Sequence, residues 1–435
     1  MPEGCSLICL ERQRRRTHYL SELREGVEAT IVAWLADKDE RSGAVVLRDA
    51  SGLRELTVRG GRGEELLRLP RETLLRIRGL YDGGRLTVKD YEVLLRPAEE
   101  PPVRYTRLSD DLRELVKHCP WYLRSAYWSS VIKLQHYMLW HAREFLYARG
   151  FVELLPPMVS VVSDPGLRGA KKLRTTLYGE EYELTSSVIM YKQATAAVYE
   201  RVFFVARNIR EEPVENAETG RHLVEFTQLD VEWALASLDD VIRLAEELLR
   251  HVSRKLLDEH QDLVLSLNRD FAEFEPPFPR VSYDEALEVA RRLGYDEKWG
   301  RELSQQAETA LAEYYGSPVW VVRFPAESRG FYYLPDPSDP KYNLDFNLIL
   351  PKGYGEIIDG GTREYRHSEL ARRIRLLGEP LEKYSWFLDL VRRGGVPPSS
   401  GWGLGVERLT RYVAGTRHIA LATIFPKLPG LVGTP

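Results

Sequence analysis

The feature that most constrains the fold is a run of alternating glycines near the C-terminus. Residues 401–408 read Gly-Trp-Gly-Leu-Gly-Val-Glu-Arg. This spacing differs from the GxGxxG dinucleotide fingerprint and from a phosphate loop that ends in GK[ST]. Because alternate residues of a strand point to opposite faces, the run predicts a strand with one bare face, which a flat ligand or another backbone approaches closely. Arg408 precedes a helical run, Leu409–Val413, and is placed to meet a phosphate.

A second block lies about 180 residues earlier. Residues 207–212 read Arg-Asn-Ile-Arg-Glu-Glu and follow an apolar run, and residues 221–232 read Arg-His-Leu-Val-Glu-Phe-Thr-Gln-Leu-Asp-Val-Glu. A polar stretch separates them, so the pattern predicts a strand, a loop and a second strand. Gln228, Asp230 and Glu232 then share one strand face. A face with this much charge requires a buried partner or a polar ligand.

Together the two blocks resemble motifs 2 and 3 of the class II aminoacyl-tRNA synthetases, most closely the subclass b enzymes of the asparaginyl and aspartyl type. Motif 2 in that family contains Arg-x-Glu, a loop, Arg-His and a Glu-Phe-Thr-Gln-x-Asp-x-Glu strand, and motif 3 contains the alternating glycines followed by Glu-Arg. The resemblance is strong over residues 121–430 and weaker over residues 1–97. The Gly-Tyr-Gly-Glu phrase at 353–356 and the Pro429-Gly430 ending also resemble the archaeal asparagine synthetase paralogue of the asparaginyl enzymes.

The resemblance implies an α+β fold with a class II antiparallel sheet of six or seven strands flanked by helices. It also implies an N-terminal OB-type β-barrel, ATP and Mg²⁺ as cofactors, and a homodimer. The expected domains are a barrel of the anticodon-binding type at 1–97, a linker at 98–120 and a catalytic domain at 121–435.

Length and composition agree with this assignment. A chain of 435 residues exceeds one typical domain. No apolar stretch reaches the ~18 residues that span a bilayer, and the three cysteines Cys5, Cys9 and Cys119 fit reduced thiols in a cytoplasmic protein. The net charge is −4, so tRNA binding has to use local basic patches.

Short β-like runs separated by turn signals fill the first 97 residues and predict a five-stranded barrel, a fold that often binds single-stranded nucleic acid. The runs are Val27–Trp34, Gly43–Arg48, Arg54–Val58, Leu74–Gly79 and Arg85–Val93. The family places an aromatic side chain where this chain reads Ala44-Val45-Val46-Leu47. Stacking on an aromatic ring contributes ~1–3 kcal/mol per base, so its loss weakens the expectation of anticodon reading.

The middle of the chain predicts further elements. Charged and apolar positions predict helices over 107–118, 123–149 and 281–299, and a strand over 319–324. The helix at 123–149 ends at Gly150 and is followed by Phe-Val-Glu-Leu-Leu-Pro-Pro, which resembles the dimer-forming motif 1 of the family.

The resemblance assigns roles to individual residues. Arg210 and Arg408 are the expected catalytic residues. Those expected at ATP are Arg210, Glu212, Arg221, His222, Phe226, Glu356 and Arg408. Those expected at the amino acid are Asp164, Lys192, Gln228, Asp230 and Arg363. Glu356 and Glu225 are the expected metal ligands. The family has a further metal-binding Asp where this chain has Asn347, and Asp345 is the candidate to replace that carboxylate.

The expected chemistry is attack of an amino-acid carboxylate on the α-phosphate of ATP. Both reactants are anionic, so arginines must neutralise them and align them in line. Two cations, Lys192 and Arg363, facing one side chain favour aspartate as substrate. An asparagine enzyme would need an acidic neighbour, with Asp359 and Asp164 as the candidates, and the sequence leaves the two amino acids open.

The acceptor of the adenylate also stays open. The retained barrel favours transfer to tRNA. The alternative is an aspartate–ammonia ligase that releases free asparagine, and a third reading is a catalytically silent paralogue that binds RNA or a partner. The intact Arg210, Glu212, Glu356 and Arg408 argue against the third.

Overall fold

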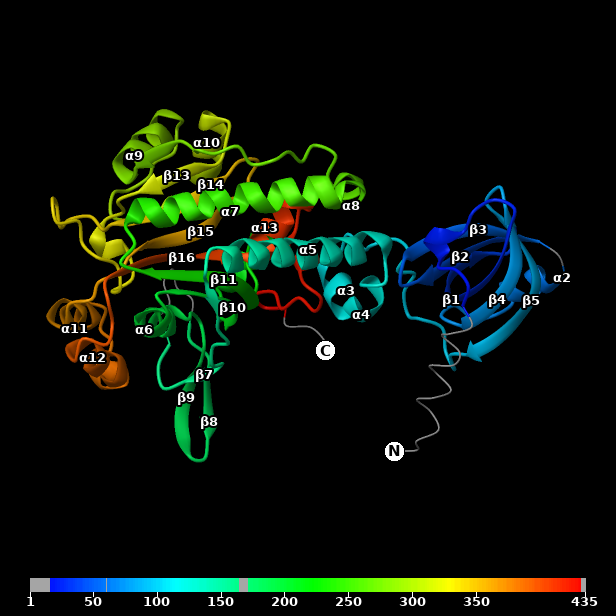
Figure 1. Ribbon diagram of the computed structural model, residues 1–435, viewed down its shortest axis with the longest axis horizontal. Helices are drawn as coiled ribbons and strands as arrows, with labels where there is room; N and C mark the ends of the chain where they lie inside the picture. Colours follow the sequence, from blue (N-terminus) through cyan, green and yellow to red (C-terminus); the bar gives the residue numbers. More distant parts are fainter. Residues whose placement is uncertain (1–15, 60, 164–170, 432–435) are drawn as a thin grey trace. The chain divides into compact units, whose positions relative to one another are not determined.

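The computed structural model describes residues 16–59, 61–163 and 171–431. Cys5, Cys9 and Asp164 therefore lie outside the described residues. The chain divides between Ser129 and Ser130 into two compact units, which Figure 1 shows in blue to cyan and in cyan to red. Among the described helices, none has the length and apolar character needed to cross a membrane.

The N-terminal unit contains a closed five-stranded barrel with the strand order β1-β2-β3-β5-β4. All five predicted strands are confirmed. Alternation along them turns one set of side chains inward, where Ile31, Leu47 and Ile77 are fully buried. The strands, with helix α2 between β3 and β4, are β1 (Val27–Asp39), β2 (Ala44–Asp49), β3 (Gly52–Arg59), α2 (Gly61–Leu67), β4 (Leu74–Asp82) and β5 (Arg85–Leu95).

The end of strand β2 has a structural role within this unit. The Arg48 guanidinium lies over the ring of Trp34, 4.6 Å from its centroid, and pairs with Glu72 at 3.1 Å. Asp49 is buried and accepts a hydrogen bond from the backbone N–H of Leu20 at 2.8 Å. Both side chains therefore stabilise the barrel.

A shorter helical segment than predicted follows the barrel. The helix expected over 107–118 is confined to α3 (Leu112–Lys117), because Asp111 caps its first turn by accepting from the N–H of Arg113. Helix α4 (Cys119–Tyr122) comes next, with proline in its first turn. Helix α5 (Ala126–Ala148) matches the prediction for 123–149 closely.

The C-terminal unit is built on an eight-stranded sheet with the order β12-β13-β14-β15-β16-β11-β10-β6. Six of its strands, from β13 to β10 in this order, pair antiparallel as predicted. Two short strands that were not predicted, β12 and β6, extend the sheet by parallel pairing with β13 and β10. The strands are β6 (Val152–Glu153), β10 (Arg201–Ile209), β11 (Glu225–Ala234), β12 (Arg280–Ser282), β13 (Val319–Val322), β14 (Asp345–Leu350), β15 (Gly355–Thr362) and β16 (Ser399–Gly405).

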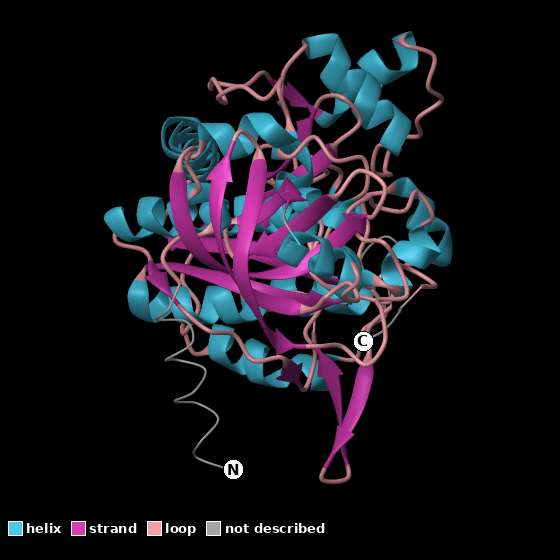
Figure 2. Cartoon of the chain, turned by 90° about the vertical axis from the view of Figure 1, so that its right-hand side faces the viewer, coloured by secondary structure: helices cyan, strands magenta, loops and turns pink. Residues whose placement is uncertain are grey.

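Helices cover both faces of this sheet (Figure 2). The Trp402 indole points to one face and donates to the carbonyl of Val241 on α7 at 3.0 Å. Lys192 of α6 reaches the other face and donates to the Trp402 carbonyl at 3.2 Å. The remaining helices are α6 (Ile189–Tyr199), α7 (Leu238–Glu259), α8 (Gln261–Leu267), α9 (Tyr283–Arg292), α10 (Gln305–Tyr315), α11 (His367–Leu376), α12 (Ser385–Arg392) and α13 (Val406–Val413).

One helix of this unit is shorter than predicted, and a small second sheet was not predicted. The helix predicted over 281–299 is α9 alone, because it ends before Gly294, whose φ of +94° does not continue a helix. A small three-stranded sheet, β7-β9-β8, projects from the unit (Figure 2). Its strands are β7 (Val159–Ser160), β8 (Arg174–Leu177) and β9 (Glu180–Leu184).

Candidate active site

A cleft on the α6 side of the large sheet gathers most of the predicted site residues. Eleven of the thirteen line it, from α6, the β10–β11 segment, β15 and the residue after it, and α13. They are Lys192, Arg210, Glu212, Arg221, His222, Phe226, Gln228, Asp230, Glu356, Arg363 and Arg408. Asp164 lies outside the described residues, and Glu225 does not line the cleft.

The alternating glycines form one wall of this cleft. Gly401, Gly403 and Gly405 stand directly opposite Glu232, Asp230 and Gln228 in the register of β16 and β11. A Cβ added at Gly401 would lie 2.3 Å from Glu232 Oε2, and one at Gly403 would lie 2.9 Å from Asp230 Oδ1. The predicted bare face is therefore confirmed, and it makes room for the polar side chains of the neighbouring strand.

Two cations and two carboxylates neutralise each other at the inner end of the cleft. Lys192 Nζ lies 3.1 Å from Asp230 Oδ1 and 3.7 Å from Glu232 Oε2. Arg363 Nε donates to both oxygens of Glu232, at 3.1 and 3.2 Å. All four side chains are at most 5% exposed. The formal charge of this group is zero.

Two polar atoms of this neutral group have no hydrogen-bond partner among the described residues. They are Asp230 Oδ2 and Arg363 Nη1, both buried. One is an acceptor and the other a donor, and both residues line the cleft. A carboxamide matches this pair, since its NH₂ donates to a carboxylate and its carbonyl accepts from a guanidinium. A carboxylate satisfies only the guanidinium.

Arginines dominate the outer part of the cleft. Arg210 donates from Nε to the carbonyl of Ser186 at 3.1 Å, and its guanidinium lies over the Phe226 ring, 5.1 Å from the centroid. Arg408 donates to the Glu356 carbonyl at 2.8 Å and to its side chain at 3.2 Å. Arg221 pairs with Glu308 of α10 at 2.8 Å. Guanidinium groups suit a polyphosphate because they donate paired, charge-assisted hydrogen bonds to phosphate oxygens.

The predicted pair of metal carboxylates does not form. Glu225 falls on the face of β11 opposite Phe226, because alternate strand residues point to opposite sides, and there it pairs with Arg207 at 2.5 Å. Asp345 is not a substitute either. It is fully buried and accepts from Arg329 Nε and the Phe324 N–H, each at 2.9 Å.

Burial raises the pKa of Asp345 to about 6, although Arg329 and the Phe324 N–H favour its charged form. Glu356 is thus the one predicted metal ligand that lines the cleft. Its Oε2 accepts from Asn347 Nδ2 at 3.0 Å.

The sequence did not predict two buried residues: Glu407, which lines the cleft, and Arg329, which pairs with Asp359 and Glu302, two residues that line it. Arg329 is fully buried and pairs with Asp345 at 2.9 Å, Asp359 at 2.8 Å and Glu302 at 3.1 Å. Nothing in its local sequence marks it. Glu407, in contrast, belongs to the glycine motif, and its place there could have marked it as a site residue. Its burial raises its pKa to about 7, against the opposing effect of the hydrogen bonds it accepts from the Thr227 N–H.

The family follows from comparison with known proteins. Residues 114–429 match the family of tRNA synthetases, class II (D, K and N). The chain belongs to this family. It is therefore a class II aminoacyl-tRNA synthetase, an ATP-dependent ligase, and the predicted fold class is confirmed.

Individual relatives cover nearly the whole chain. An asparagine–tRNA ligase of Pelotomaculum thermopropionicum is 32% identical over 421 residues, which covers 93% of this chain and 96% of that protein. That of Pyrococcus furiosus is 30% identical, covering 94% and 98%. The structure resembles asparaginyl-tRNA synthetase from Pyrococcus horikoshii in complex with asparaginyl-adenylate, with a TM-score of 0.85, 28% identity, and coverage of 96% of this chain and 99% of that one.

Proposed function

We propose that this synthetase activates asparagine with ATP and transfers it to tRNA. The observation that carries the proposal is the neutral group at the inner end of the cleft, with its unpartnered acceptor on Asp230 and unpartnered donor on Arg363. This pair complements the side-chain amide of asparagine. The names of the relatives reported above agree with this substrate.

This geometry favours asparagine over aspartate, which two cations facing one side chain had favoured. Lys192 and Arg363 are both present, but Asp230 and Glu232 already neutralise them. A substrate carboxylate would add a third negative charge beside two buried ones, which is unfavourable. Of the two acids expected to absorb the extra charge, Asp359 is instead held by Arg329 at 2.8 Å, and Asp164 lies outside the described residues.

In the proposed activation step, Arg210 bridges the asparagine carboxylate and the α-phosphate, while Arg221, His222 and Arg408 hold the outer phosphates. Phe226 stacks on the adenine, and Glu212 accepts from its amino group. No general base is required because the attacking carboxylate is already ionised. The arginines act by neutralising and aligning two anions.

The donor set of the cleft fits Mg²⁺ held mainly by ATP. Mg²⁺ commonly binds one or two carboxylates and completes its shell with phosphate oxygens and water. Glu356 lines the cleft and offers one such carboxylate, which Arg408 and Asn347 hold in place, whereas Asp345 is fully buried against Arg329. When bound there, the ion would offset charge on the phosphates.

We propose that the acceptor is tRNA and that the barrel binds part of it. The proposed domains are the barrel at 1–97, a linker at 98–120 and the catalytic domain at 121–435. The barrel supports this choice over ammonia, and the relatives reported above are named as tRNA ligases. Arg48 is engaged by Trp34 and Glu72 within the barrel, so base contacts have to come from other side chains. We place the enzyme in the cytoplasm, with its tRNA substrate.

We also propose a homodimer formed around residues 121–160. Large apolar side chains are exposed along α5 and the segment after it, where a partner would cover them. They are Trp140, Tyr147, Val152, Leu155, Met158 and Val161, and Leu155 is 90% exposed.

Pyrophosphate exchange tests the proposed substrate. Asparagine should drive exchange of labelled pyrophosphate into ATP, and aspartate should do so at least tenfold less efficiently. Aspartate-driven exchange that equals or exceeds the asparagine rate would contradict the amide recognition argued above.

A further inference from the structure

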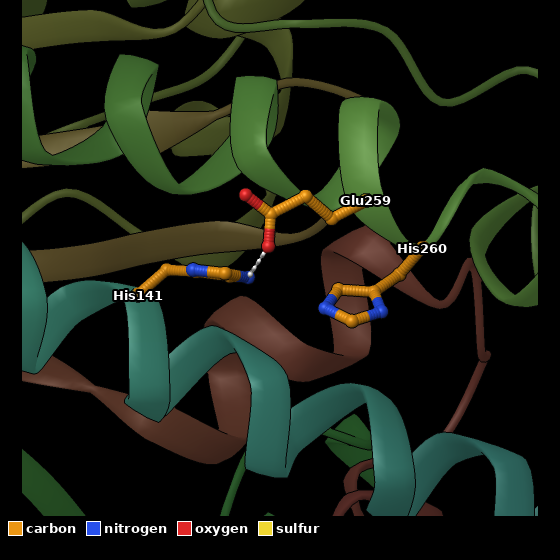
Figure 3. A group of neighbouring side chains, drawn as sticks. All are labelled: His141, Glu259 and His260. Atoms are coloured by element: carbon orange, nitrogen blue, oxygen red, sulfur yellow. Dashed lines mark ion pairs between the residues drawn. The ribbon is translucent and has the colours of Figure 1, made fainter.

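A cluster of histidine and carboxylate side chains lies between α5 and α7, away from the cleft. It consists of His141 on α5, Glu259 at the last position of α7, and His260 directly after it (Figure 3). One ligand-type atom from each residue lies within 4.8 Å of the others. We propose that this cluster binds a divalent transition metal of the zinc type and so connects α5 to the end of α7.

His141 supplies the strongest evidence. Its side chain is 2% exposed, and its Nε2 is buried with no hydrogen-bond partner among the described residues. The nearest carboxylate oxygen, Glu259 Oε2, lies 3.9 Å away, too far for a hydrogen bond. A buried imidazole nitrogen without a partner is unfavourable. A metal ion at this place would satisfy it.

The other nitrogen of His141 is already positioned for metal binding. Nδ1 lies 2.8 Å from Glu144 Oε2, in the next turn of α5. A carboxylate that accepts from one ring N–H fixes the tautomer, so that the second nitrogen presents its lone pair. Metal-binding histidines commonly have such an outer partner.

Glu259 and His260 are held so that each still offers a ligand atom. Lys255 donates to Glu259 Oε1 at 2.5 Å, which leaves Oε2 on the side of His141. The His260 ring is stacked on Tyr137, with 3.6 Å between centroids and 17° between planes.

The donor set indicates the class of metal. Two imidazoles and one carboxylate suit Zn²⁺ and its neighbours in the first transition row, whereas Mg²⁺ and Ca²⁺ prefer oxygen ligands alone. Tetrahedral bonds of ~2.0–2.1 Å place ligand atoms about 3.3 Å apart. Glu259 is exposed and His260 partly so, so their side chains have room to close the present spacing. Water would take the fourth position.

Metal titration of the full chain tests the proposal. The protein carries Cys5→Ser and Cys9→Ser, so that thiols outside the described residues do not contribute, and Mg²⁺ is present in excess at the cleft. After removal of metals by a chelator, Co²⁺ is added and its visible absorption is recorded, followed by displacement with Zn²⁺. We expect uptake of one equivalent with the intense bands of tetrahedral Co²⁺, and a rise in Tm with Zn²⁺.

Matched variants identify the ligands. Glu259→Gln and His260→Gln should each weaken Zn²⁺ binding by about 100-fold or more, and Glu144→Gln by about 10- to 100-fold as an outer partner. His136→Gln, an exposed histidine on the same helix, should bind as the parent does. The proposal is overturned if the parent takes up no stoichiometric metal, or if Glu259→Gln and His260→Gln bind it as tightly as the parent.

Discussion

The Asp230→Asn substitution tests how the enzyme separates asparagine from aspartate. Asp230 is 4% exposed, its Oδ1 pairs with Lys192 at 3.1 Å, and its Oδ2 is the unpartnered acceptor in the cleft. The amide has nearly the same shape but no charge. If the amide oxygen stays on Lys192, an NH₂ donor replaces Oδ2, the acceptor proposed for the asparagine NH₂, and Lys192 loses part of its charge compensation.

The magnitude follows from charge and distance. Two like charges about 4 Å apart repel by about 4 kcal/mol at an effective dielectric constant of 20, which is about 10³-fold in binding. Lys192 offsets part of the repulsion between Asp230 and a substrate carboxylate. We therefore expect the asparagine-to-aspartate ratio of kcat/KM to fall by about 10²- to 10³-fold in Asp230→Asn.

Pyrophosphate exchange with each amino acid gives this ratio directly. Asp359→Asn is the matched control, because it removes the same charge from the cleft but both its oxygens are engaged, by Tyr333 and by Arg329. The control should change the ratio by less than about tenfold. A change below tenfold in Asp230→Asn, with the protein folded, would refute the amide recognition proposed here.

Three further predictions concern catalysis, stability and assembly. Arg210→Ala should abolish asparagine-dependent exchange, since two anions would meet without a bridging charge; exchange within tenfold of the parent would exclude that role. Burial raises the pKa of Glu407 to about 7, so the native state binds more protons than the unfolded state between pH 4.5 and 7, and the free energy of unfolding should decrease as pH rises through that range. Glu407→Gln should reduce this decrease in chemical denaturation, and an unchanged slope would contradict it. Leu155→Glu should shift sedimentation from a dimer to the 50.1 kDa monomer, whereas an unaltered dimer would locate the interface elsewhere.

Periodicity was sufficient to predict the barrel strands and the strand face of the cleft. Alternation at Gly401 and Gly403 predicts a bare strand face, and alternation at Asp230 and Glu232 predicts a charged one. The register that places these two faces against each other depends on pairing between strands about 170 residues apart. Local patterns do not contain that information.

The neutralisation of the buried cations by carboxylates could not be predicted from the sequence either. Lys192 and Arg363 are visible as cations, but their neutralisation by carboxylates of β11 depends on three-dimensional contact. The ion pair between Arg329 and Asp345 also depends on three-dimensional contact. It keeps Asp345 from replacing the metal-binding carboxylate that is absent at Asn347. Glu225 was assigned from a motif, although the period of two already placed it on the face opposite Phe226.

The product formed from ATP and each amino acid distinguishes a tRNA ligase from an aspartate–ammonia ligase. With labelled asparagine and tRNA, we expect acid-precipitable label on tRNA together with AMP and pyrophosphate. With labelled aspartate and ammonium, we expect no free asparagine. Free labelled asparagine from aspartate, with no label on tRNA from asparagine, would show that the enzyme is not an asparagine–tRNA ligase.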